Sequence, residues 1–216
     1  MTGDPTGFDR LARGYRLLEV VAFGRDLERA RFAFLGELAH ASDILLLGEG
    51  DGRCAERLAA IAPAARILCV DSSPGMIRRA AARLESSATA SRVTFLCADL
   101  RSYAPPREAF DAVATLFVLD CFSDGEVAGI VGRIAPSLRP GARWLFADFV
   151  MPLRGWPRLR ARVWLYVLYA FFRLGAGLGV RSLPASEDIL GGALGPRART
   201  AEFQSGMIRS AVYIRS

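Results

Sequence analysis

Short aliphatic runs alternate with longer amphipathic stretches between residues 43 and 150. This rhythm is typical of βαβ units, which place parallel strands side by side in one sheet. The expected strands are Ile44–Leu47, Arg66–Val70, Val93–Cys97, Ala112–Leu116 and Ala142–Phe149, and the expected helices are Gly52–Ile61, Pro74–Glu85 and Gly125–Leu138. The pattern therefore predicts an α/β fold, with a Rossmann-like and mostly parallel sheet that carries helices on both faces.

The flanks of this core add helices before it and two strands after it. Phe8 to Ala39 reads as one or two amphipathic helices, and a further helix is expected from Pro157 to a glycine cluster at 175–179. Two final strands at Thr200–Gln204 and Met207–Arg215 bring the expected total to seven. A chain of 216 residues, 52% of them hydrophobic, can bury one substantial core, so we expect a single domain over 1–216. Its parts are a helical segment (1–41), a ligand-binding core (42–150) and a closing segment (151–216).

Several classes of protein are disfavoured by composition. Charged residues interrupt the first apolar positions, so no secretory signal is apparent; they are Asp4, Asp9, Arg10 and Arg13. The longest apolar run, Val163–Phe172, has about half of the ~20 residues that a helix needs to cross a bilayer. The four cysteines form no CxxC pair. We therefore expect a cytoplasmic protein with reduced thiols, no transmembrane segment and no metal site.

The charge is unevenly distributed. The net charge is +6, and all 28 basic residues are arginine. Residues 151–216 hold 10 arginines against three acidic residues. This basic segment is compatible with an anionic substrate, with peripheral contact to a membrane surface, or with a solvated helix face.

The stretch LLLGEGDGR, residues 45–53, follows the first expected strand. Glycines at a strand end let the backbone turn tightly and approach a ligand, and ligands of open parallel sheets bind at the carboxyl ends of the strands. A dinucleotide fingerprint would need a third glycine where Arg53 stands. Glu49 and Asp51 would repel a pyrophosphate but suit a cation. The turn therefore favours a ligand with sulfonium and ammonium groups, S-adenosylmethionine, over NAD.

Two further carboxylates follow the next two expected strands. Asp71 lies 21 residues after Gly50, where a carboxylate can accept hydrogen bonds from both ribose hydroxyls. Asp99 follows the third strand and could accept one from an adenine amino group. Either residue alone fits a helix cap equally well.

Five segments together resemble the class I S-adenosylmethionine-dependent methyltransferases: GEGDG, Asp71 with the SSPGM that follows it, CADL, FDAVATLFVLDCF and LRPGARWLFADF. The flanking FDRLARGY and FFRLGAGLGV are similar to small-molecule enzymes of the ubiquinone/menaquinone-biosynthesis type. The resemblance implies that the N-terminal helical segment is a lid over the cofactor. The residues implied to bind the cofactor are Gly48, Glu49, Gly50, Gly52, Asp71, Ser72, Met76, Asp99, Leu100, Thr115 and Tyr15.

Within that set, the resemblance implies a role for each group. The glycines underlie the methionine part, Asp71 holds the ribose, Met76 flanks the adenine, and Asp99 with Leu100 reads its edge. The family often has an acid two residues before the first glycine, where this chain has Leu46. Glu49 is expected either to take over the contact to the ammonium group or to pair with Arg53 and brace the turn.

Candidates for catalysis and acceptor binding follow from position. Methyl transfer is an in-line displacement and needs a base only if the acceptor arrives protonated. Asp120 and Asp148 are the candidate bases, with purely structural roles as the alternative. Aromatic walls and a cationic rim are expected after the fifth strand, and their residues are Tyr166, Tyr169, Phe172 and Arg173. The expected acceptor is a small apolar or aromatic molecule, methylated on O, C or N.

Two other functions remain as alternatives. Methylation of nucleic acid is disfavoured because LDCF stands after the fourth strand, where base methyltransferases carry an NPPY-like tetrapeptide, and no nucleic-acid partner is expected. A cofactor-binding module without catalysis is the second alternative. The sequence predicts neither the acceptor's identity nor the oligomeric state.

Overall fold

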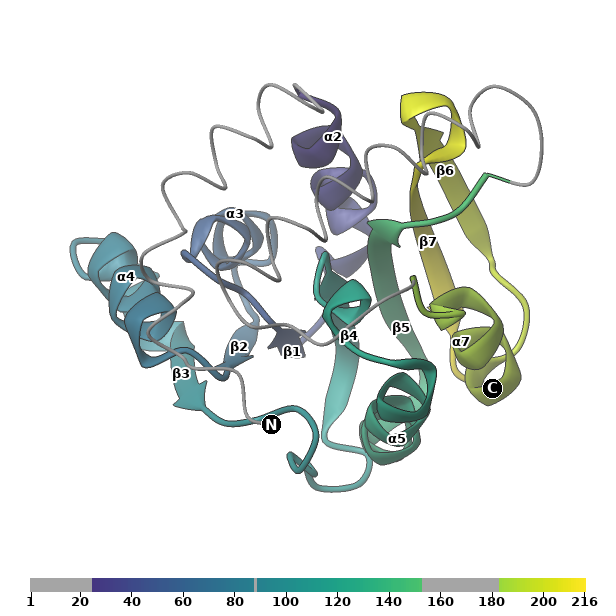
Figure 1. Cartoon of the computed structure of the whole chain (residues 1–216). Coiled ribbons are helices and arrows are strands. Elements are labelled where there is room, and N and C mark those ends of the chain that lie inside the picture. Colours follow the sequence, from purple (N-terminus) through teal and green to yellow (C-terminus); the bar gives the residue numbers. More distant parts are fainter. Residues whose placement is uncertain (1–24, 88, 153–182) are drawn as a thin grey trace.

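The computed structural model describes residues 25–87, 89–152 and 183–216. Its strands are β1 (Asp43–Leu47), β2 (Arg66–Asp71), β3 (Val93–Cys97), β4 (Phe110–Leu116), β5 (Leu138–Phe149), β6 (Arg199–Phe203) and β7 (Ile208–Ile214). They form one seven-stranded sheet in the order β3-β2-β1-β4-β5-β7-β6 (Figure 1). β1 to β5 are parallel, whereas β7 runs antiparallel to both β5 and β6. The predicted fold, a mostly parallel Rossmann-like sheet, is confirmed.

Strand β1 lies inside the sheet, between β2 and β4. Leu45 is in register with Leu68 of β2 on one side and with Val113 of β4 on the other. Residues 44–47 are all buried, as expected of a parallel strand covered on both faces. The chain order reverses between β1 and β4, so their carboxyl ends form the switch point where open α/β sheets bind ligands.

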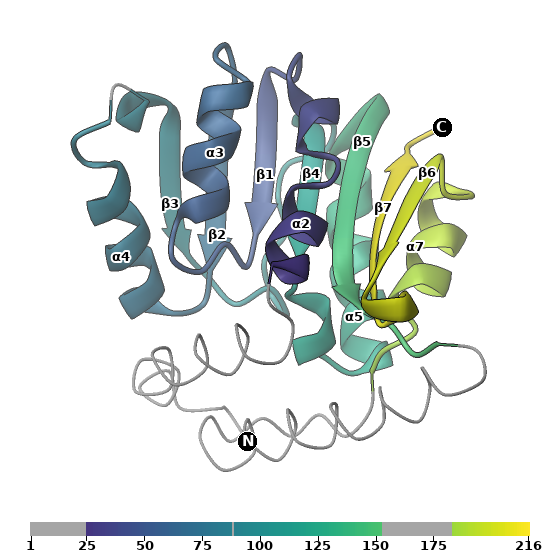
Figure 2. The ribbon, with the colours of Figure 1, turned by 90° about the horizontal axis from the view of Figure 1, so that it is seen from above.

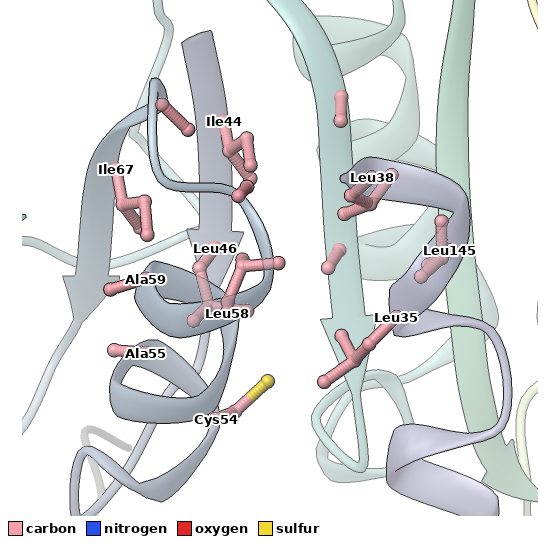
Figure 3. Packing of buried hydrophobic residues seen from close by; sticks show 14 of the residues in the cluster. Leu35, Leu38, Ile44, Leu46, Cys54, Ala55, Leu58, Ala59, Ile67 and Leu145 are labelled. Carbon is pink, nitrogen blue, oxygen red and sulfur yellow. The ribbon is translucent and has the colours of Figure 1, made fainter. Parts of the chain in front are cut away.

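Helices cover both faces of the sheet (Figure 2). One face carries α2 (Asp26–Phe32), α3 (Arg53–Ile61) and α4 (Pro74–Leu84), and the other carries α5 (Asp124–Ile134) and α7 (Ser186–Leu194). On the first face, Leu46 of β1 and Leu58 of α3 lie in one cluster with two leucines of the short 3-10 helix η1 (Leu35–Leu38) (Figure 3). On the second face, Trp144 of β5 is fully buried in the cluster to which α5 and α7 contribute.

The helix starts follow from local chemistry. Ser73 caps α4 by accepting the Met76 N–H at 3.2 Å, and Pro74 occupies the first helical turn. Ser123 and Glu126 form a capping box at the start of α5. The helix expected to reach residue 138 ends at Ile134 instead, because Pro136 cannot continue it. β5 accordingly begins at Leu138, four residues earlier than predicted.

Helix α7 was not predicted, because Gly191 and Gly192 disfavour a helix interior. Leu190 and Leu194 are nevertheless buried four residues apart on one helical face. Glu187 and its neighbour Asp188 lie in the first turn, where acidic residues are favourable. Within the described ranges, the structure holds no helix long and apolar enough to cross a membrane.

Candidate functional site

The glycine turn after β1 has a left-handed backbone that glycine adopts without strain. Gly48, Gly50 and Gly52 all have positive φ, at 65°, 72° and 87°. A Cβ on Gly48 would lie 2.2 Å from Cγ2 of Val118, and one on Gly52 would lie 2.8 Å from Cα of Ala80. A Cβ on Gly50 would meet nothing within 4 Å. Two of the glycines therefore allow close packing, while Gly50 presents bare backbone to the space beyond the strand ends.

Asp71 joins this turn to the end of β2. Its Oδ2 accepts the Gly50 N–H at 3.0 Å, and its Oδ1 accepts the Ser73 N–H at 2.8 Å. Burial raises the pKa of the Asp71 carboxyl, while these hydrogen bonds oppose the rise. Gly50 and Asp71, both expected to bind the cofactor, are thus brought together at the carboxyl ends of β1 and β2.

Glu49 holds the start of α3. Its Oε1 accepts the N–H groups of Cys54 and Ala55, both at 2.9 Å, and so supplies the cap that Gly52 lacks. Burial raises the pKa of Glu49 to about 7, against the opposing effects of the hydrogen bond from Ala55 and the positive charge of Arg31.

The expected alternative, a brace between Glu49 and Arg53, does not form. Arg53 Nε instead pairs with Asp51 Oδ1 at 3.1 Å, and Arg83 Nε donates to the Asp51 carbonyl at 2.8 Å. Arg83 also lies 3.4 Å from Asp51 Oδ2. Two guanidinium groups thus compensate Asp51, which leaves Glu49 as the acid of the turn without an ion pair among the described residues.

The residues expected around an adenine lie at different depths. Asp99 is in an exposed turn, where Oδ1 accepts the Arg101 N–H at 2.9 Å and Oδ2 pairs with the Arg101 guanidinium at 3.4 Å. Leu100 is buried in the core, and Ser72 is exposed just beyond β2. Met76 is partly buried in the first turn of α4.

Thr115 differs from its predicted role. Its side chain is fully buried in β4, where Oγ1 accepts the Trp144 Nε1–H at 2.9 Å and donates to the Leu145 carbonyl at 3.5 Å. Both capacities of the hydroxyl are used inside the sheet. Its position ties β4 to β5 and gives the Thr115 side chain no surface to offer a cofactor.

Asp148 fits the structural alternative expected for it beside the role of a base. It is 1% exposed, and its two oxygens accept the backbone N–H groups of Asp120, at 3.1 Å, and Phe149, at 2.9 Å. Burial, and then the charge of Asp120, raises its pKa far above the ordinary value. Asp148 therefore anchors the 3-10 helix η3 (Leu119–Cys121), whereas Asp120 remains partly accessible.

The other predicted residues, Tyr15, Tyr166, Tyr169, Phe172 and Arg173, lie outside the described residues. The structure adds residues that sequence reasoning missed. Val118 packs onto Gly48, and Phe117 has φ 62° directly after β4. Arg31 stands over the Phe117 ring at 5.4 Å from its centroid. None of these carries a local sequence signal, because each contact joins segments distant in the chain.

Comparison with known proteins decides the family. Residues 44–141 match the family described as "Methyltransferase domain". The ubiquinone/menaquinone biosynthesis C-methyltransferase UbiE of Syntrophotalea carbinolica is 33% identical over 188 residues, which cover 84% of this chain and 76% of that protein. The chain belongs to the class I S-adenosylmethionine-dependent methyltransferases. The predicted family, and with it the enzyme class and the cofactor, is confirmed.

Solved structures share the methyltransferase fold. N-methyltransferase NodS from Bradyrhizobium japonicum, in complex with S-adenosyl-L-homocysteine, is 19% identical with a TM-score of 0.63, and the match covers 88% of this methyltransferase and 87% of NodS. The mitomycin 7-O-methyltransferase MmcR is 20% identical with a TM-score of 0.68, over 89% of this chain. The methyltransferase spans 55% of the MmcR chain.

Proposed function

We propose that this methyltransferase binds S-adenosylmethionine across the carboxyl ends of β1 and β2 and methylates a small apolar or aromatic molecule. The observation that carries the proposal is the hydrogen bond from Gly50 N–H to Asp71, beside Glu49. It brings bare backbone, a hydrogen-bond acceptor and an anion together at the carboxyl ends of β1 and β2, next to the switch point. A ligand with hydroxyl groups and positive charge fits this set of groups.

Asp71 and Glu49 each keep hydrogen-bond acceptor capacity for the cofactor. A carboxylate has about four acceptor sites, and Asp71 uses one per oxygen for backbone N–H groups, which leaves acceptor capacity for the ribose hydroxyls. Glu49 commits Oε1 to α3, and we assign Oε2 to the ammonium group. Gly50, where a Cβ would meet nothing within 4 Å, lets the methionine end approach the backbone, and Gly48 makes room for Val118 in the same turn.

Methyl transfer requires mainly that the protein position the cofactor and the acceptor and exclude water from between them. The cofactor supplies a methyl group on a sulfonium, and the positive charge disperses as that group moves in line to the acceptor. At the ends of β4 and β5, the rings of Phe117 and Phe149 meet edge to face with centroids 5.6 Å apart. We propose that these apolar groups exclude water beside the reacting centre, and that Asp120 is the base when the acceptor carries a proton.

The class of acceptor follows from this apolar edge and from the relatives. UbiE is named for ubiquinone and menaquinone biosynthesis, and MmcR for mitomycin. We therefore propose an acceptor with an apolar or aromatic body rather than a nucleic acid. In this proposal the chain is one domain, in which 42–150 binds the cofactor and 151–216, with Tyr166, Tyr169, Phe172 and Arg173, faces the acceptor.

Calorimetry followed by turnover tests this proposal. S-adenosylhomocysteine is expected to bind and NAD is not, because the acid of the glycine turn favours an ammonium and repels a pyrophosphate. Mass spectrometry would then follow methyl transfer to a panel of quinols, phenols and an unrelated RNA. Binding without turnover on any small acceptor would favour a non-catalytic module, and methylation of the RNA alone would overturn the substrate class.

A further inference from the structure

Arg31 lies in the last turn of α2, a helix that hydrogen bonds hold to the β6–β7 side of the sheet. Ser210 Oγ of β7 donates to the Ala30 carbonyl at 2.7 Å, and Gln204 Nε2 donates to Asp26 Oδ2 at 2.7 Å. These bonds tie both ends of α2 to the β6–β7 region. The helix therefore presents Arg31 from a fixed position.

The guanidinium of Arg31 stacks on an aromatic ring that is itself anchored. It lies 5.4 Å from the centroid of Phe117, whose N–H donates to the Ala147 carbonyl at 2.7 Å and whose ring packs edge to face on Phe149. Stacking of this kind orients a guanidinium and leaves its edge N–H groups available for hydrogen bonds.

The charge of Arg31 reaches the glycine turn without being paired there. Phe117, the ring on which Arg31 stacks, directly precedes Val118, whose side chain lies against Gly48, and the Arg31 charge opposes the burial that raises the pKa of Glu49 and of Cys54. Yet no carboxylate of the described residues comes within 4.0 Å of its guanidinium, whereas Arg53 and Arg83 on the same side of the sheet both pair with Asp51. Arg31 is thus a preoriented cation beside the site, and no described residue pairs with its hydrogen-bonding edge.

The methionine end of the cofactor is an amino acid, with an ammonium and a carboxylate on the same carbon. Glu49 supplies an anion for the first group, and the second, once desolvated, needs a cation or several N–H donors. We propose that Arg31 binds the α-carboxylate of S-adenosylmethionine, so that Glu49 and Arg31 together recognise the zwitterion. This inference rests on the proposed cofactor site and assigns one end of it to α2.

The test uses three ligands that differ only at the amino-acid end: S-adenosylhomocysteine, its decarboxylated analogue and 5′-methylthioadenosine. Calorimetry would compare the wild type with Arg31→Gln and with Arg29→Gln. Arg29 is the matched control because it lies on the same helix, is 67% exposed and pairs with Asp26. We expect Arg31→Gln to lower affinity for S-adenosylhomocysteine about 10- to 100-fold, as for loss of a charge-assisted hydrogen bond, with less than about twofold change for the other two ligands.

Each other outcome contradicts the assignment. Equal losses of affinity for all three ligands would show that Arg31 has a structural role. An unchanged affinity for S-adenosylhomocysteine with a raised KM for the acceptor would show that Arg31 binds the acceptor instead. If Arg31→Gln does not fold, the wild type alone decides, because equal affinity for S-adenosylhomocysteine and its decarboxylated analogue overturns the proposal. A wild type that binds none of the three ligands would instead refute the proposed cofactor site.

Discussion

Replacing Glu49 by glutamine tests the charge at the glycine turn with little change in shape. The glutamine carbonyl can still accept the N–H groups of Cys54 and Ala55, so α3 keeps its cap. What disappears is the negative charge, which the wild type gains as pH rises through the raised pKa of about 7. The variant therefore mimics protonated Glu49 at every pH.

The expected magnitude follows from that pKa. A hydrogen bond to a charged group contributes about 1 kcal/mol or more beyond a neutral one, so bound ammonium should lower the pKa of Glu49 by about one unit. The wild type should then match Glu49→Gln in affinity for S-adenosylhomocysteine at pH 5.5. It should exceed the variant about five- to tenfold at pH 7.5, where an α-amino group still holds most of its proton.

Calorimetry at pH 5.5, 6.5 and 7.5, in two buffers of different ionisation enthalpy, measures both the affinity and the protons released. Near pH 6.5 Glu49 should release about half a proton when the ligand binds. Glu49→Gln should therefore release about half a proton fewer than the wild type. Glu56→Gln is the control, because Glu56 lies on the same helix with a 52% exposed side chain. A ratio of wild-type to Glu49→Gln affinity that does not change with pH, or that is largest at pH 5.5, would refute a charged contact from Glu49.

The same carboxyl makes a prediction for folding without ligand. The pKa of Glu49 is higher in the folded chain, about 7, than its ordinary value of 4.5, so folding favours the protonated form. The contribution of Glu49 to the free energy of unfolding is therefore most favourable below about pH 4.5. It falls by up to about 3 kcal/mol as pH rises towards and through 7. Urea unfolding at pH 5.5 and 8 should show Glu49→Gln gaining stability relative to the wild type at the higher pH. Equal differences at both values would show that Glu49 is not desolvated.

Three further substitutions probe the rest of the site, and a fourth probes the candidate base. Asp71→Ala should weaken binding of S-adenosylhomocysteine by about 1.5–3 kcal/mol in calorimetry, and unchanged affinity would show that Asp71 only links the two turns. Gly48→Ala should lower the free energy of unfolding by about 2–5 kcal/mol in urea titrations, because it combines positive φ with overlap of Val118, and a smaller loss would mean that the turn relaxes. Asp148→Asn should cost about 1–3 kcal/mol of stability because its amide cannot accept both N–H groups. Asp120→Asn should keep cofactor affinity and lower turnover on a protonated acceptor, and equal losses of both would refute Asp120 as a base.

The strands and the ligand-binding edge of the sheet could be predicted because their signals are local. Each strand is a short aliphatic run, and the glycine turn and the aspartates stand directly at the strand ends. Helix α7 was missed because Gly191 and Gly192 outweigh the spacing of Leu190 and Leu194 in a local reading, although packing against α5 and the sheet decides the structure.

The roles of individual carboxylates could not be predicted from local sequence. Asp51 and Glu49 look alike in GEGDG, but Arg83, 32 residues away from Asp51, pairs with only one of them. Asp148 and Asp120 likewise look equivalent, yet only the burial of β5 shows that Asp148 holds backbone N–H groups instead of facing a ligand. Charge pairing and burial are tertiary properties, and they decided which acids remain available.

A crystal structure with S-adenosylhomocysteine bound would show which groups of the protein hold the ribose and the amino-acid end of the cofactor. The expected binding mode has both ribose hydroxyls within hydrogen-bonding distance of Asp71, the amino-acid end over the glycine turn, and its ammonium group in contact with Glu49 Oε2. A structure in which the amino-acid end turns away from the glycine turn, with Glu49 contacting only the N–H groups of α3, would contradict it.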